Sequence, residues 1–396
     1  MTGKKKPDYH ADKAVRASVA TPVPFAMVGG GEGAFIGEVH RWAAALAGNC
    51  RLVSGAFSSD PDRSLRSGAA IGLAAVRVYP DWRTMIAEEA GRIGFVAIVT
   101  PNHLHAASAI AALEAGLPVL CDKPLAGTLA DATAIAAAAT RTGGLVGVTH
   151  AYAGYPMVEQ MGAMVRDGVV GAIRRVAVSY TQDWLSRAGD AEASAQAAWR
   201  TDRARSGDTG ALGDIGSHAA HLVEHVTGER IAAVAADLRA AVAGRLLDDD
   251  GAALFRLSGG GRGTLVASQV PTGDINQLDL SIYGEEASLH WRQEDPNRLT
   301  VKRRDRPAEL WTAGAGVPYL ASAARTAART PAGHPEGYIE AFANIYRSFA
   351  EAVASGATTD RPGFGTLEEA MRTMRFLAAA KASSDAGAVW TKVGKR

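Results

Sequence analysis

Short, wholly apolar runs alternate with helical segments in the first part of the chain, from about residue 24 to residue 149. The runs predicted to be strands are 25–31, 50–57, 95–101, 117–124 and 144–150. Between them, segments 38–48 and 106–116 carry apolar residues at helical spacing, and each ends at a glycine, as helices often do. Wholly apolar strands separated by helices predict a parallel sheet that is covered on both faces.

The pattern changes after residue 150. A predicted helix at 157–171 is followed by longer strands of alternating or mixed polarity, at 174–184, 251–259, 263–271, 276–284 and 287–293. Alternation indicates antiparallel strands with one solvated face, and the glycines at 259–263 are predicted to form a hairpin turn. We therefore expect an α/β protein with three parts: a flexible arm at 1–20, a domain at 21–149, and an α+β domain with an open, mostly antiparallel sheet at 150–396.

The amino-acid composition limits the kind of molecule that the protein is expected to bind. The chain has 396 residues, of which 47% are hydrophobic and 21% charged, as in globular proteins. Lys and Arg number 42 against 41 Asp and Glu, so no overall charge attracts nucleic acid or a membrane surface. We predict a small-molecule partner. Two cysteines far apart in sequence and the lack of a long apolar run suggest a cytoplasmic protein without a membrane span.

A glycine-rich loop, VGGGEGAFIG at 28–37, follows the first predicted strand and precedes the first helix. This is the context of a Rossmann dinucleotide-binding turn, in which backbone amides and a helix N-terminus hold a pyrophosphate. Gly29, Gly31 and either Gly33 or Gly37 would permit the close approach, and Phe35 and Ile36 complete an enlarged loop. We therefore predict a dinucleotide cofactor.

The end of the second strand bears on the choice between NAD and NADP. An acid normally binds the adenosine ribose hydroxyls at this position, but here Ser58 occupies it. Asp60 follows two residues later and would suit NAD, whereas Arg63 would suit a 2′-phosphate. The sequence therefore does not decide between NAD and NADP.

Two segments carry candidate catalytic groups. Lys123 stands at the end of a buried strand between Asp122 and Pro124, and Asp214 precedes His218 by four residues, so that the two would share a helix face. His221 and His225 have the same spacing, which raises a metal site. We do not expect one, because no HExxH pattern is present and no third ligand is evident.

From residue 24 onward, these segments resemble the glucose-fructose oxidoreductase, inositol dehydrogenase and MocA (Gfo/Idh/MocA) family. The resemblance is carried by the glycine loop, TPNHLHAASAIAALEAGLPVLCDKP at 100–124, Trp199-Arg200, GDIGSH at 213–218, and HPEGYIEAFANIYRSF at 334–349. Asp122 stands where the family usually has glutamate.

The resemblance implies roles for individual residues. Lys123 and His218 would flank the substrate hydroxyl over the nicotinamide, with one acting as base and the other as cation, and Asp214 would orient His218. Tyr152, Arg200 and His334 are further candidates for substrate contacts. Besides the residues of the two preceding loops, the implied cofactor-binding residues are Thr100, Pro101, Asn102, His105, Asp122 and Lys123.

The family also implies an activity and an assembly. We expect an NAD(P)-dependent oxidoreductase that interconverts a secondary ring hydroxyl and a ketone on a sugar, glycoside or inositol-like polyol. Two alternatives stay open: a glycosidase that uses bound NAD for transient oxidation, and a non-catalytic cofactor sensor. A homo-oligomer, dimer or tetramer, formed through the C-terminal sheet is the expected assembly.

Overall fold

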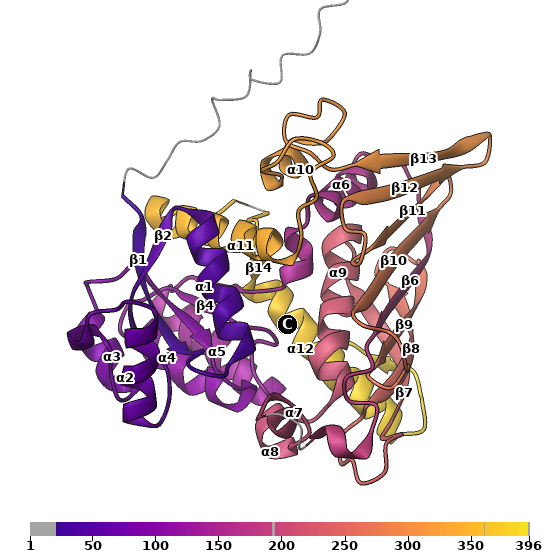
Figure 1. Ribbon diagram of the computed structural model, residues 1–396. Coiled ribbons are helices and arrows are strands. Elements are labelled where there is room, and N and C mark those ends of the chain that lie inside the picture. The colour runs from indigo at the N-terminus through magenta and orange to yellow at the C-terminus, as the bar shows by residue number, and fades with distance from the viewer. Residues whose placement is uncertain (1–20, 192–194, 360, 395–396) are drawn as a thin grey trace, which may run out of the picture.

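The computed structural model describes residues 21–191, 195–359 and 361–394, which form two lobes, each built on one sheet (Figure 1). The sheet of the first lobe has the strand order β14-β5-β4-β3-β1-β2. Strands β1 to β5 are parallel, as predicted, because their apolar side chains are buried on both faces. The strands are β1 (Val23–Gly29), β2 (Cys50–Ala56), β3 (Phe95–Val99), β4 (Val119–Cys121), β5 (Val146–Val148) and β14 (Gly365–Thr366).

Helices cover both faces of this sheet. Gly48, at the C-terminal cap of the first helix, has a φ of 77°, which a residue without a Cβ adopts without strain. The helices are α1 (Phe35–Ala47), α2 (Pro61–Ala70), α3 (Trp82–Glu89), α4 (His105–Glu114), α5 (Leu129–Thr142) and, from the C-terminal part of the chain, α11 (Tyr338–Ser355).

The second lobe is an open sheet of order β13-β12-β11-β10-β6-β9-β8-β7-β15, antiparallel except where β6 pairs with β9. Figure 1 shows helices on the face toward the first lobe and none on the outer face. This confirms the α/β fold with an antiparallel second sheet. The strands are β6 (Ile173–Thr181), β7 (Ile231–Arg239), β8 (Asp250–Leu257), β9 (Arg262–Ser268), β10 (Gln277–Gly284), β11 (Ala287–Arg292), β12 (Arg298–Arg303), β13 (Arg306–Thr312) and β15 (Thr391–Lys392).

The remaining helices join the two lobes or cover the second sheet. They are α6 (Pro156–Arg166), α7 (Ala195–Arg200), α8 (Arg203–Ser206), α9 (Ser217–Thr227), α10 (Ser322–Ala327) and α12 (Leu367–Asp385). Within the described ranges, no helix is long and apolar enough to cross a bilayer. The predicted arm at 1–20 lies outside the described residues.

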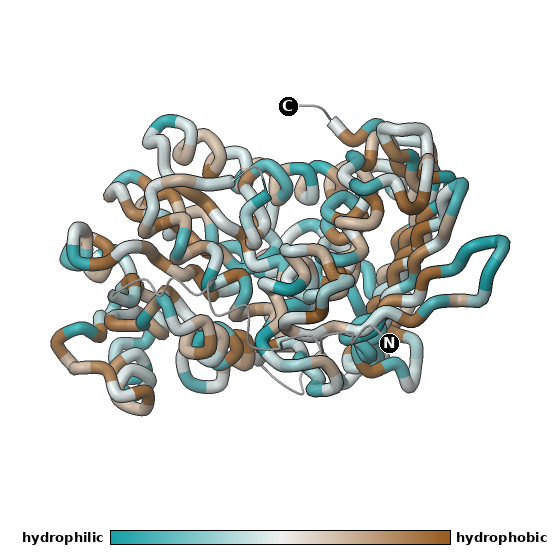
Figure 2. The backbone as a smooth tube through the Cα atoms, turned by 90° about the horizontal axis from the view of Figure 1, so that it is seen from above, coloured by the Kyte–Doolittle hydropathy of each residue, from teal (hydrophilic) through white to brown (hydrophobic). Residues whose placement is uncertain are grey.

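The predicted hairpin turn at 259–263 connects β8 and β9, which pair antiparallel with Arg256 opposite Arg262. In Figure 2 the strands of the second sheet carry hydrophobic segments, while the turn that projects farthest is hydrophilic.

The sequence analysis missed β7, whose alanine-rich sequence IAAVAADLR has the composition of a helix. Pairing with β8 overrides that propensity and buries Ile231, Val234 and Ala236 on one face.

The C-terminal part of the chain returns to the first lobe, which differs from the predicted division at residue 150. Strand β14 pairs antiparallel with β5 at the edge of the first sheet. On α11, Tyr346 and Phe349 pack against Phe25 and Phe95 in one buried cluster. The first lobe is therefore completed by residues far along the chain, because its sheet needs an apolar helix on that face.

Candidate active site

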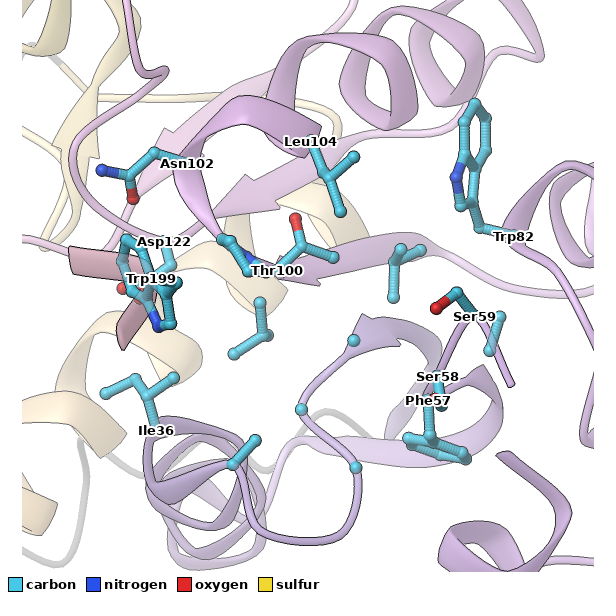
Figure 3. A pocket seen from close by; sticks show the side chains of 18 of the residues that line it. Ile36, Phe57, Ser58, Ser59, Trp82, Thr100, Asn102, Leu104, Asp122 and Trp199 are labelled. Carbon is cyan, nitrogen blue, oxygen red and sulfur yellow. The ribbon is translucent and has the colours of Figure 1, made fainter. Parts of the chain in front are cut away.

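A cavity of about 600 Å³ lies at the carboxyl ends of β1, β3 and β4, the place where open α/β sheets bind ligands. Figure 3 shows Asp122, Trp199 and Ile36 at one side of this cavity, and Ser58, Ser59 and Trp82 at the other. We call the first side, with Lys123, Asp214 and Arg200, the lysine end. We call the opposite side, with Ser58, Arg63 and Arg83, the serine end.

The glycine loop forms the cavity floor between the two ends. Gly29 has a φ of 82°, and a Cβ at Gly31 would lie 2.7 Å from the Phe57 carbonyl oxygen. A Cβ at Gly37 would lie 2.2 Å from the Gly30 carbonyl oxygen, so Gly37 lets α1 pack directly on the loop. No side chain of the described residues caps the N-terminus of α1, which leaves amides for an anion. These features fit a dinucleotide pyrophosphate.

At the serine end, the carboxylates are already used as helix caps. Asp60 accepts a hydrogen bond from the Arg63 backbone N–H at 2.9 Å, and Asp81 accepts from the backbone N–H groups of Arg83 and Thr84. The hydroxyl of Ser58 accepts from the Asp60 backbone N–H at 3.1 Å. This end of the cavity is therefore lined by serine hydroxyls and arginines together with Asp81, whereas Asp60 does not line it.

At the lysine end, one carboxylate joins both lobes. The Nζ of Lys123, two residues past β4, donates to the Asp214 backbone oxygen at 2.7 Å and to its Oδ1 at 2.9 Å. Asp214 lies in a π-helical turn (Leu212–Gly216) that leads into α9. Its Oδ2 accepts from Arg200 Nε at 3.2 Å and from Gln269 Nε2 at 3.0 Å. Lys123 and Asp214, two of the predicted catalytic residues, are thus brought together from distant parts of the chain.

The charged groups around Asp214 and Asp122 keep both carboxyl groups ionised. Burial alone would raise the pKa of Asp214, but Arg200 and Lys123 outweigh burial and hold it well below its usual range. Burial is likewise outweighed at Asp122, whose pKa is lowered by His40, Lys123 and a hydrogen bond from Thr149 at 2.7 Å. Both acids are ionised, so Lys123 keeps two anionic neighbours that hold it at the cavity edge.

His218 lies in the first turn of α9 and is buried. Its Nδ1 has no hydrogen-bond partner among the described residues, and its ring lies edge-on to the ring of Tyr152 at 4.7 Å. Burial, with a smaller contribution from Lys123, lowers the pKa of His218 well below 6.5. A neutral imidazole is the form of histidine that can accept a proton.

Asp214 was predicted to orient His218, but no hydrogen bond is observed between these two described side chains. The Asp214 carboxylate accepts from Lys123, Arg200 and Gln269 instead. Hydrogen bonds from ammonium and guanidinium groups are stronger than those from a neutral imidazole. The carboxylate of Asp214 therefore bonds to Lys123 and Arg200 rather than to His218. Asp214 therefore acts on His218 through charge and through its hold on Lys123.

The predicted site residues, including those already described, divide into two groups. Those that line the cavity are Gly29, Gly31, Gly33, Ile36, Ser58, Arg63, Thr100, Pro101, Asn102, Asp122, Lys123, Arg200 and Asp214. Those outside its lining are Phe35, Asp60, His105, Tyr152, His218 and His334.

Each residue of the second group has its own environment. Phe35 and His334 are exposed. His105 is buried between the carbonyl oxygens of Thr100 and Pro124, at 2.8 and 3.0 Å, so it braces the loops behind the cavity. The hydroxyl of Tyr152 bonds to that of Tyr180, in a polar network beside His218.

Sequence analysis missed several residues that build the site. Trp199 lines the cavity, and the guanidinium of Arg200 lies 4.4 Å from the centre of its ring. The Trp-Arg pair was the signal that could have identified Trp199. Gln269 follows β9 and binds Asp214, but no motif marks it in the sequence.

Comparisons with known proteins agree with this geometry. Residues 23–150 match the model of the oxidoreductase family with an NAD-binding Rossmann fold, and residues 158–290 match that of the GFO/IDH/MocA C-terminal domain. An inositol dehydrogenase homolog from Azotobacter vinelandii, solved with NAD⁺, is 35% identical, with a TM-score of 0.89, over 94% of this chain and 98% of that one. The same homolog has been solved with NADH and myo-inositol.

Two curated relatives extend the comparison. The uncharacterized oxidoreductase YfiI of Bacillus subtilis is 34% identical over 94% of this chain and 98% of its own length. Levoglucosan dehydrogenase of Pseudarthrobacter phenanthrenivorans is 30% identical over 56% of this chain and 60% of its own length.

The fold and the site define a two-lobed oxidoreductase that uses NAD or NADP. The matches to both family models, which cover more than half of the chain, show that it belongs to the Gfo/Idh/MocA family.

Proposed function

We propose that the protein is a dehydrogenase or reductase of a cyclic polyol or sugar, exchanging a secondary ring hydroxyl for a ketone. The observation that carries this proposal is the lysine end of the cavity. There, Lys123 is held by Asp214 beside His218, whose Nδ1 is buried and has no hydrogen-bond partner among the described residues. The relatives solved with myo-inositol and named for levoglucosan support the substrate class.

The residues divide the proton chemistry between them. When bound, the nicotinamide ring accepts the hydride from the carbinol carbon of the substrate. His218 takes the hydroxyl proton, because its lowered pKa leaves it neutral, and the Lys123 ammonium stabilises the negative charge that develops on the substrate oxygen. Asp214 and Asp122 hold Lys123 in place, and the reverse reaction uses the same groups with the opposite proton movement.

Substrate selectivity arises from hydrogen-bonding side chains next to His218. The Tyr180 hydroxyl donates to Asn276 Oδ1 at 2.6 Å, and Gln182 Nε2 donates to the same oxygen at 2.6 Å. Together with Tyr152, these groups match a ligand that carries several hydroxyls, since a site built from such groups rejects analogues that lack them. Arg200 at the cavity edge is a further candidate for a hydroxyl contact.

A screen of inositols, aldoses and glycosides with NAD and with NADP tests the function. We expect reduced nicotinamide to accumulate with one of these classes and a keto product to form in equal amount. Cleavage of a glycoside without net cofactor reduction would instead indicate the glycosidase mechanism. Tight cofactor binding without turnover of any of these compounds would indicate a sensor.

We also propose a homo-oligomer formed through the outer face of the second sheet. Leu254 on β8 and Leu310 on β13 are 53% and 58% exposed, and no described helix covers this face. Light scattering of the purified protein tests this. A monomer at micromolar concentration would contradict it.

A further inference from the structure

A pair of histidines lies on α9, outside the lining of the cofactor cavity. His221 and His225 are one helical turn apart, and Glu369 of α12 faces them. One ring nitrogen of each histidine and one carboxylate oxygen of Glu369 all lie within 4.8 Å of one another. Glu159 of α6 adds a second carboxylate, 3.1 Å from His225 Nε2. Three helices therefore contribute to one group of nitrogen and oxygen donors.

His221 supplies an unused buried donor atom. The residue is 3% exposed, and its Nε2 has no hydrogen-bond partner among the described residues. Leaving a buried polar atom unpaired is unfavourable, so such atoms usually mark a missing partner. The ring of His221 stacks on that of His150 at 3.8 Å with a 7° angle between planes, which fixes its orientation.

The surrounding charges favour a cation at this point. Glu159 lies 3.1 Å from His225 Nε2, and Glu369 lies 3.7 Å from His225 Nδ1. Of the arginines nearby, Arg372 binds Glu224 at 2.6 Å and Glu368 at 3.1 Å. Arg361 donates to the His225 backbone oxygen at 2.9 Å. The donors at the centre of the cluster thus face two carboxylates.

We propose that His221, His225 and Glu369 bind a divalent cation of the late first transition row, zinc above all, while Glu159 holds the other ring nitrogen of His225. Two imidazoles and carboxylate oxygens are a donor set that Zn²⁺ takes in proteins. A cavity of about 400 Å³, lined in part by His225 and Glu369, provides the entry path that such a site requires. The third ligand, which the sequence did not reveal, comes from a helix far along the chain.

The site is structural rather than hydrolytic. His221-Leu222-Val223-Glu224-His225 has the order His-x-x-Glu-His, which in zinc peptidases provides two ligands and a general base. Here Glu224 is occupied, because it accepts hydrogen bonds from the Ile231 backbone N–H at 2.7 Å and from Arg372 Nε at 2.6 Å. The cation would instead tie α9 to α12 behind the active site, with α6 joined to them through Glu159 and His225, so it acts on stability.

Zinc titration of protein without an affinity tag, after dialysis against a chelator, tests the site. We expect one equivalent of Zn²⁺ per chain to bind and to raise the unfolding temperature. His225→Ala and Glu369→Gln should each weaken binding on the order of 100-fold, because even residues that only support a ligand are worth 10–100-fold. His290→Ala, at the half-buried histidine of β11, is the control and should bind zinc like the wild type.

A second measurement on the wild type does not depend on whether the variants fold. Cobalt(II) added to the stripped protein should give the visible absorption of a tetrahedral site, and zinc should abolish it. No saturable binding of either ion would overturn the proposal and leave His225 as an imidazolium between two carboxylates. Equal binding by all three variants would also overturn it, because the ion would then lie elsewhere.

Discussion

The lysine end and the serine end of the cofactor cavity are built from different parts of the chain. At the lysine end, Lys123 comes from the first lobe and Arg200 and Asp214 from the second, joined by charge-assisted hydrogen bonds. At the serine end, Ser58, Asp60 and Arg63 belong to one short segment between β2 and α2, held by local capping bonds. The geometry of the lysine end therefore depends on how the two lobes meet, whereas the positions of Ser58 and Arg63 depend mainly on the loop between β2 and α2.

The largest effect is expected at the lysine end. Lys123→Met should lower turnover on the order of 100-fold or more, the usual scale for an acid–base or charge-stabilising group. Cofactor affinity, measured by fluorescence titration, should stay close to that of the wild type, because the glycine loop, and not Lys123, would hold the pyrophosphate. Lys302→Met, at an exposed lysine of β12, is the matched control. Unchanged turnover in Lys123→Met would remove this residue from the mechanism.

Double-mutant cycles sharpen the contrast within the lysine end. His218→Ala should reduce turnover strongly and Asp214→Asn less, and the double variant should cost less than the sum. The hydrogen bonds predict a larger coupling between Lys123 and Asp214, which are in direct contact, than between Asp214 and His218. Steady-state rates of both cycles provide the measurement, and additive effects in both would show that the groups act independently.

At the serine end the expected effect is on selectivity. Ser58→Asp should shift preference toward NAD by about tenfold, equal to about 1.4 kcal/mol, because a carboxylate binds ribose hydroxyls and repels a 2′-phosphate. The ratio of kcat/KM for the two cofactors measures the shift, with turnover at saturation largely kept. An unchanged ratio would mean that Ser58 does not face the ribose.

The smallest effect concerns pH. A base works in its neutral form, which is lost as the pH falls through its pKa, and burial places the pKa of His218 well below 6.5. Protonation of His218 should therefore cost little activity between pH 6.5 and 8, and an acidic loss of kcat/KM should begin below that range. In His218→Ala, any decrease of kcat/KM that remains at acidic pH should follow a different pH dependence from that of the wild type. An acidic midpoint near pH 7 in the wild type would contradict a buried neutral His218.

The sequence predicted the features that depend on local pattern. The glycine loop, the parallel strands and the position of Lys123 after β4 follow from apolar runs and turn residues, and they are confirmed in the fold. Gln269 and Glu369 could not be predicted, because each becomes relevant only when β9 or α12 is packed beside a helix distant in sequence. Strand β7 was missed for the same reason, since its alanines form a strand only beside β8.

The return of α11 and β14 to the first lobe bears on how the protein is made. Phe25 and Phe95, which stack at 4.8 Å, present an apolar surface that Tyr346 and Phe349 cover only after most of the chain has been synthesised. Domains generally fold during synthesis from the N-terminus, but this one lacks a helix and an edge strand until translation is nearly complete. The half that leaves the ribosome first thus cannot finish folding until the C-terminal part of the chain has followed it.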